Sequence, residues 1–199
     1  MMRLLAHLPD ALAIDGQSYP VYTDFRHWMA FELMLTDTEI GEKELPLMML
    51  SWFRETPPEN ISRAVYALLW FYRGGQPPET AQGSGTARRI YHFDQDIEMI
   101  YASFASGDGY GMDLAETEHL HWWKFRAMLL HISPRTAIGR AMGIRASDDS
   151  ELSEAQRRLK RVYDLERQGA PLTLAERDEE LKKRAREARQ RSEAARTCH

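Results

Sequence analysis

Residues 74–87 divide the chain into two apolar-rich parts and contain no large apolar side chain. Their glycine, proline and polar composition is typical of a flexible linker. Because the stretches on both sides carry apolar residues at helical spacing, we expect two helical lobes. The predicted boundaries are 1–73 for an N-terminal lobe, 74–88 for the linker, 89–168 for a second helical lobe, and 169–199 for a charged C-terminal helix or tail.

The composition indicates a protein that folds around a core in a reducing compartment. Hydrophobic residues make up 43% of the 199 residues, which is enough for a packed interior. The one cysteine, Cys198, allows no intrachain disulfide. The longest apolar run, 64–72, has nine residues, whereas a membrane-spanning helix needs about 20. We therefore expect a soluble cytoplasmic protein without a membrane partner.

The N-terminal lobe opens with the pattern of a β-hairpin. Leu12 and Ile14 alternate with smaller residues, and Asp15-Gly16 favours a tight turn with positive φ. Pro20 has no N–H to donate to a ladder, so the second strand is predicted at an edge.

Three helices are predicted after the hairpin. Asp24 or Thr23 stands where a helix N-cap is expected, just ahead of an apolar-periodic run. The second helix is expected over 42–53, with Pro46 in its first turn. The third is expected to start near Asn60, where a stripe of apolar residues begins.

Four helices are predicted in the second lobe, over 94–105, from 114 to about 131, from 133 to 142, and over 152–165. In the first of them, Asp94, Asp96 and Glu98 lie where carboxylates favour the positive end of the helix dipole. Gly143 is expected just after the end of the third. The predicted fold is mainly α, a multi-helix domain in two lobes with a small N-terminal β-hairpin and a long charged C-terminal helix.

Charge is distributed unevenly along the chain. Residues 1–150 carry a net charge of -7 and residues 151–199 carry +3, which together give -4. An acidic body argues against nucleic acid as a partner, because phosphate contacts dominate such affinity. Arg135, Arg140 and Arg145, which follow a tight helical corner, suggest either solvent-facing arginines or the second helix of a helix-turn-helix.

The polar motifs do not predict an enzyme, a cofactor site or a metal site. His119 and His121 are two apart on an expected helix and point to different faces, so we expect surface histidines there. Residues 94–98 lack the glycine of a calcium loop, and residues 107–111 lack a Walker lysine. Cys198 lies at the terminus, where a catalytic thiol is not held in place.

Two of the five tryptophans, Trp122 and Trp123, are adjacent. Adjacent residues on one helix point in different directions, so one of them is expected to face a second packing surface. That surface is either the other lobe or a binding partner. Aromatic side chains beside an arginine are common anchors of interfaces, and the predicted partner-binding residues are Trp122, Trp123, Phe125 and Arg126.

Ordered segments between residues 12 and 165 carry a family resemblance. The most specific is LHWWKFRAML at 120–129, and the others are 14–16, 19–21, 23–26, 68–74, 89–96, 100–104, 110–114 and 136–145. In this order they resemble the small phage proteins often called gene product fifteen, from tailed phages and prophages of Gram-positive bacteria. The charged C-terminal segment lies outside the resemblance.

The resemblance implies a non-enzymatic protein encoded among tail-morphogenesis genes, typically just ahead of the tape-measure gene. It thereby implies a tail assembly chaperone of the host bacterial cytoplasm, which keeps the helical tape-measure protein soluble until tail-tube subunits replace it. The expected partners are the tape-measure protein, a second tail assembly chaperone and further copies in a possible homo-oligomer. Two other interpretations stay open, a structural tail component or completion factor retained in the virion and a helix-turn-helix DNA-binding protein.

Overall fold

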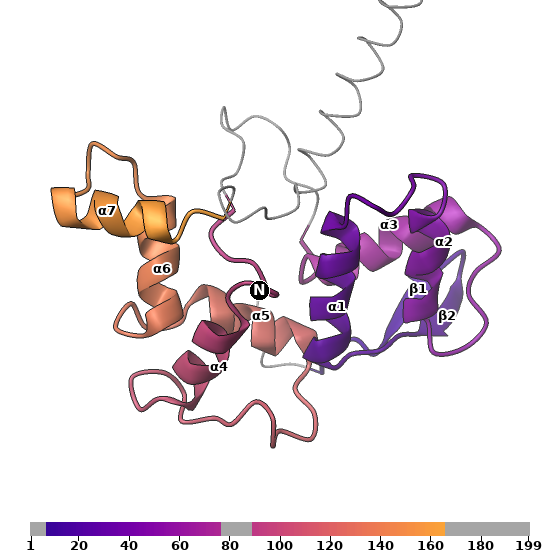
Figure 1. Ribbon diagram of the computed structural model, residues 1–199. Helices are drawn as coiled ribbons and strands as arrows, with labels where there is room; N and C mark the ends of the chain where they lie inside the picture. Colours follow the sequence, from indigo (N-terminus) through magenta and orange to yellow (C-terminus); the bar gives the residue numbers. More distant parts are fainter. Residues whose placement is uncertain (1–6, 77–88, 166–199) are drawn as a thin grey trace, which may run out of the picture.

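The computed structural model describes residues 7–76 and 89–165. In this part the chain is mainly helical, with a small two-stranded antiparallel sheet near its start (Figure 1). The elements are β1 (Ala11–Ile14), β2 (Gln17–Pro20), α1 (Phe25–Thr36), α2 (Leu45–Met49), the 3-10 turn η1 (Leu50–Trp52), α3 (Ile61–Tyr72), α4 (Ile97–Ala105), α5 (Trp122–Leu130), α6 (Ala137–Ala146) and α7 (Glu154–Val162).

The predicted hairpin and the predicted fold class are confirmed. Asp15 and Gly16 have φ values of 52° and 79°, as the two central residues of a tight hairpin turn require. The first and third helices of the N-terminal lobe also begin as predicted. The Asp24 carboxylate accepts the N–H of Arg26 at the start of α1, and the Asn60 side chain accepts the N–H of Arg63 at the start of α3.

Several predicted helix boundaries are wrong. The helix expected over 42–53 is only α2, followed by a 3-10 turn, and no side-chain cap precedes it. The helix expected from 114 begins at Trp122, because Asp113 holds a separate turn by accepting the N–H groups of Ala115 and Glu116. The helix expected over 133–142 begins only at Ala137, where the Thr136 side chain accepts the N–H of Gly139, and Gly143 lies inside it because α6 continues to Ala146.

The helix expected from Asp94 also begins later, at Ile97. The Asp96 carboxylate makes no bond to the first turn of α4. It instead accepts the N–H of His92 at 2.9 Å and two bonds from the guanidinium of Arg145. Arg145, predicted to face solvent, is therefore a buried residue and is not placed to contact a phosphate backbone.

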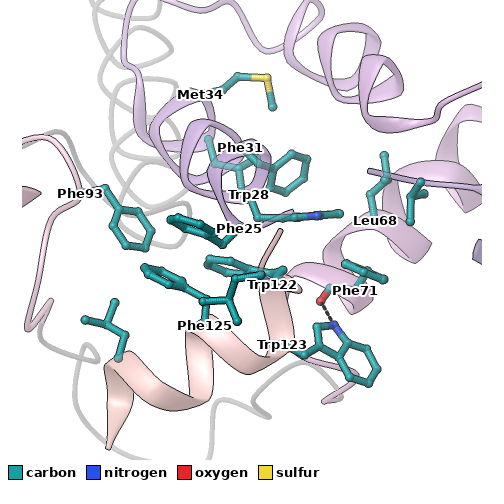
Figure 2. Packing of buried hydrophobic residues seen from close by; sticks show 14 of the residues in the cluster. Phe25, Trp28, Phe31, Met34, Leu68, Phe71, Phe93, Trp122, Trp123 and Phe125 are labelled. Atoms are coloured by element: carbon teal, nitrogen blue, oxygen red, sulfur yellow. Dashed lines mark hydrogen bonds between the residues drawn. The ribbon is translucent and has the colours of Figure 1, made fainter. Parts of the chain in front are cut away.

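One hydrophobic cluster takes side chains from both sides of residues 77–88. Figure 2 shows its centre, where Trp28 of α1 lies between Phe71 of α3 and Trp122 of α5. Phe25 and Phe125 stack beside them, with ring centroids 4.5 Å apart. The two predicted lobes therefore share a core across their junction.

Residues 77–88 of the predicted linker and the predicted charged C-terminal helix, 169–199, lie outside the described residues. Within residues 7–76 and 89–165, the longest helices have 12 residues, and none combines the length and apolarity needed to cross a bilayer.

Candidate functional site

The two adjacent tryptophans at the start of α5 are both buried. Trp122 donates its indole N–H to the carbonyl of Tyr72 at 2.7 Å. Trp123 donates to the carbonyl of Phe71 at 2.8 Å, the bond drawn in Figure 2. These carbonyls belong to the last turn of α3, where helical C=O groups lack partners within the helix. The second packing surface predicted for one tryptophan is thus the other lobe.

The remaining residues predicted to bind a partner are not arranged as a surface either. Phe125 is fully buried and stacks on Phe25 and Phe104. Arg126 is half-buried beside the end of α3, 3.5 Å from where a side chain on Gly74 would begin. The fold itself covers the aromatic side chains of this set, so they do not form an exposed contact surface.

An apolar groove lies between α1 and α4, with a volume of about 560 Å³. Its floor is Phe25, which is also part of the core cluster. Helix α1 supplies one wall at helical spacing, and α4 supplies the other from the second lobe. The lining residues are Phe25, Arg26, Met29, Ala30 and Leu33 of α1, Ile97, Glu98 and Tyr101 of α4, and Leu114 and Ala115.

The end of the groove at Leu114 and Ala115 is fastened to both walls by hydrogen bonds. Arg26 donates to the carbonyl of Leu114 at 2.6 Å and to the carbonyl of Thr117 at 2.8 Å. From the other wall, the Tyr101 hydroxyl donates to the Asp113 carboxylate at 3.0 Å. Backbone N–H groups, first that of Ala115, lower the pKa of Asp113, so it accepts this bond as a carboxylate. The groove is thus held open by its own walls.

A buried polar cluster lies near the groove but does not line it. The Glu32 carboxylate accepts the hydroxyl of Tyr72 at 2.7 Å and that of Tyr91 at 3.4 Å. Burial raises the pKa of Glu32 and of both tyrosines. The cluster ties α1 to α3 and to the segment before α4, which fixes the angle between the walls of the groove.

The two histidines that invited a metal hypothesis have separate roles. His119 Nε2 lies 3.0 Å from the Thr23 hydroxyl. His121, predicted on the surface, is buried and caps α5, because its Nδ1 accepts the N–H of Trp123 while Nε2 lies 3.0 Å from the carbonyl of Pro9. Nε2 therefore carries the proton. In the part of the chain that the structure describes, no cluster of three His, Cys, Asp or Glu side chains is arranged to hold a metal ion.

Sequence reasoning missed the groove because its two walls lie on opposite sides of the predicted linker. The only local sign is that α1 is apolar on more than one face. Trp28 and Phe31 enter the core, whereas Met29 and Leu33 are left half-exposed. An apolar stripe beside the buried one indicates a second contact surface.

Comparison with known proteins identifies the family. No curated protein and no solved structure matches the chain. The family described as bacteriophage Gp15 protein matches over residues 4–165, which includes every helix and strand described above and ends where the charged C-terminal segment begins. The chain is a member of the bacteriophage Gp15 protein family.

Proposed function

We propose that this phage protein is a tail assembly chaperone that binds apolar helical segments of the tape-measure protein. The groove between α1 and α4 is the observation that carries the proposal. The tape-measure assignment follows from the gene position that the family resemblance implies. The role requires no catalysis and no cofactor, and it is exerted in the host cytoplasm before the tail is complete.

The shape of the groove supports an α-helix as its occupant. Its walls are themselves helices, and a third helix laid between them buries an apolar stripe against both, as in other helix-in-groove complexes. Phe25 gives the floor a rigid aromatic surface. Met29 adapts to side chains of different size, because the methionine side chain is unbranched and flexible, and Leu33 adds apolar surface beside it. Such a groove accepts many segments of a long helical protein.

The rim supports a reversible complex. Arg26 and Glu98 stand among otherwise apolar lining residues. The Arg26 guanidinium already pairs with Asp24 and donates to the Leu114 and Thr117 carbonyls, so Glu98 is the charged group offered to the flank of a bound helix. Charged groups at a rim guide association and add little affinity. A complex held by one apolar stripe is therefore weak enough for tail-tube subunits to displace the chaperone.

Co-expression with the tape-measure protein tests the proposal, with two matched variants. Ile97 and Ile61 are each the first residue of a helix and are exposed to similar extents, 42% and 39%, but only Ile97 lines the groove. An aspartate is compatible with the first turn of either helix. We expect Ile97→Asp to reduce soluble tape-measure protein and its co-purification, whereas Ile61→Asp behaves as the unmodified chain.

Equal co-purification with both variants would exclude the groove as the binding site. No change in tape-measure solubility on co-expression of the unmodified chain would exclude the chaperone role. Mass spectrometry of finished particles distinguishes a chaperone from a structural tail component, because the chaperone is absent from the particles and the tail component is retained.

A further inference from the structure

Two pairs of apolar side chains are exposed at opposite ends of the molecule. On α2, Leu47 and Met48 are 57% and 44% exposed, and on α7, Leu159 and Val162 are 43% and 63% exposed. Figure 1 shows α2 at one extreme of the described structure and α7 at the other. Helix α7 packs on α6, whereas α2 packs on α1 and α3, so neither end covers the other. We call them the α2 end (residues 37–48) and the α7 end (residues 154–162).

The two ends carry opposite charge. The α2 end has four carboxylates against one lysine, a net charge of -3, and the α7 end has four basic residues against one glutamate, a net charge of +3. Lys160 of the α7 end is buried and pairs with Asp149, so the basic groups that this end exposes are Arg157, Arg158 and Arg161. None of the ion pairs that the structure shows among its described residues uses Glu42 or Glu44. Arg158 pairs only with Glu154 of its own helix, an exposed contact that exchanges readily.

We propose that copies of this chain associate head to tail, with the α7 end of one copy docking on the α2 end of the next. Leu159 and Val162 would pack against Leu47 and Met48, while Arg158 and Arg161 face Glu42 and Glu44. Each patch complements the other and not itself, so the contact is heterologous. Because the patches lie at opposite ends, a docked copy leaves one end of each kind open, and the array extends.

The size of the contact makes it weak on its own. Each end presents two exposed large apolar side chains, which are too few to fill the roughly 1,200 Å² that a stable interface buries. Exposed charges give it a strong dependence on ionic strength. Copies held side by side on one long helical partner raise each other's effective concentration, which strengthens such contacts. The inference goes beyond the proposed function, since self-association is measured without the tape-measure protein.

Sedimentation velocity of the full chain over a range of concentrations at low salt tests the proposal. We expect the mass to rise with concentration and to fall again when salt is added. Leu47→Asp and Leu159→Asp each remove one end, so each variant alone stays monomeric. An equimolar mixture forms a dimer and stops, because each variant supplies the end that the other lacks.

Matched controls separate this contact from other causes. Tyr66→Asp replaces an exposed aromatic residue of α3, 60% exposed and outside both ends, and leaves assembly unchanged. Should Leu159→Asp unfold the chain, the charge variants carry the test. Glu42→Arg with Glu44→Arg, or Arg158→Glu with Arg161→Glu, lowers the association constant about tenfold, and all four changes in one chain restore it.

Four results would overturn the proposal. The unmodified chain stays monomeric at every concentration, or either aspartate variant still dimerises alone, which indicates a symmetric contact. The mixture of the two variants gives no dimer, as expected if residues 166–199 of the same chain occupy one end. The four-residue charge exchange fails to restore association, which shows that charge complementarity does not define the contact.

Discussion

The two junctions that join distant parts of this chain are built on different principles. Helix α5 is joined to α1 and α3 by stacked aromatic rings, and two of its indole N–H groups donate to carbonyls of α3. Helix α6 is joined to the start of α4 by a buried ion pair between Arg145 and Asp96. Two guanidinium nitrogens of Arg145 lie 2.6 and 2.9 Å from the carboxylate oxygens of Asp96. Arg145 also donates to the carbonyls of Ile90 and Tyr163.

The two junctions should differ in their tolerance of amino-acid substitutions. An apolar contact keeps most of its free energy when one side chain is replaced by another of similar volume. A buried guanidinium has no such tolerance, because its desolvation is offset only while every partner is in place. We therefore expect the α5 junction to be plastic and the α6 junction to be specific, and the following changes test that contrast.

The largest effect is expected at the α6 junction. Asp96→Ala leaves the Arg145 guanidinium buried without a counter-charge and should lower the free energy of unfolding by about 3–5 kcal/mol. Arg158→Ala, which removes one partner of an exposed pair, should cost less than about 0.5 kcal/mol. Urea denaturation of both variants measures the difference. Replacing both partners, Asp96→Ala with Arg145→Met, should recover part of the loss, and similar losses from Asp96→Ala and Arg158→Ala would contradict the contrast.

A smaller effect is expected at the α5 junction. Trp122→Phe keeps an aromatic ring but leaves the Tyr72 carbonyl without the indole donor, which should cost about 1–3 kcal/mol. Trp52 donates in the same way to the carbonyl of His27, but that carbonyl is accessible to water. Trp52→Phe should therefore cost less in thermal denaturation. A loss at Trp122 as large as that of Asp96→Ala would remove the distinction between the junctions.

Two glycines of α6 sharpen the contrast within one helix. A Cβ on Gly139 would stand 2.2 Å from the carbonyl oxygen of Ser133, so Gly139→Ala should destabilise the fold by about 1–3 kcal/mol. A Cβ on Gly143 would meet nothing within 4 Å. Gly143→Ala should stabilise the chain by about 0.5–1 kcal/mol, because alanine loses less backbone entropy in a helix. Melting temperatures that shift in the same direction would show that the approach of α6 to residue 133 is not tight.

The smallest effect is a pH dependence at the α5 junction. Burial lowers the pKa of His121 below its ordinary value of 6.5, and the neutral ring is the form that accepts the N–H of Trp123. The stability that His121 contributes is therefore present above pH 6.5 and is lost as pH falls through the lower folded-state pKa. His121→Asn keeps a capping acceptor that does not titrate.

Chemical denaturation at several pH values between neutral and mildly acidic measures how the free energy of unfolding depends on pH in the unmodified chain and in His121→Asn. His92 also has a pKa lowered by burial, so the variant retains part of the dependence. If the free energy of unfolding depends on pH identically in the variant and the unmodified chain, the His121 cap does not contribute to that dependence.

Local structure was largely predictable from the sequence. Asp15-Gly16, Asp24 and Asn60 act within a few residues of where they stand, so the hairpin turn and the starts of α1 and α3 were predicted correctly. Asp96 and Arg145 were misread because each has the signature of an ordinary exposed residue, a carboxylate at a helix start and an arginine on a short helix. Their pairing joins positions 49 residues apart, which no local pattern reports.

In the candidate site, too, local features were predictable and contacts between distant segments were not. The apolar content of α1 was evident, but Met29 lines one groove with Ile97 and Leu114 only because the Glu32 cluster and Arg26 fix the helices around it. The adjacent tryptophans were expected to belong to two packing directions, one of them facing either the other lobe or a partner. Both directions lead into the interior, since α5 begins at Trp122 and its first turn lies against the end of α3.

Apolar spacing, turn residues and ordered motifs involve neighbouring residues, so the helical class, the hairpin, the starts of α1 and α3 and the family follow from the sequence alone. Only the tertiary structure decided which apolar and charged side chains remain exposed. Burial depends on what the rest of the chain places opposite a residue, so the groove and the two oppositely charged ends emerge only once the helices have packed.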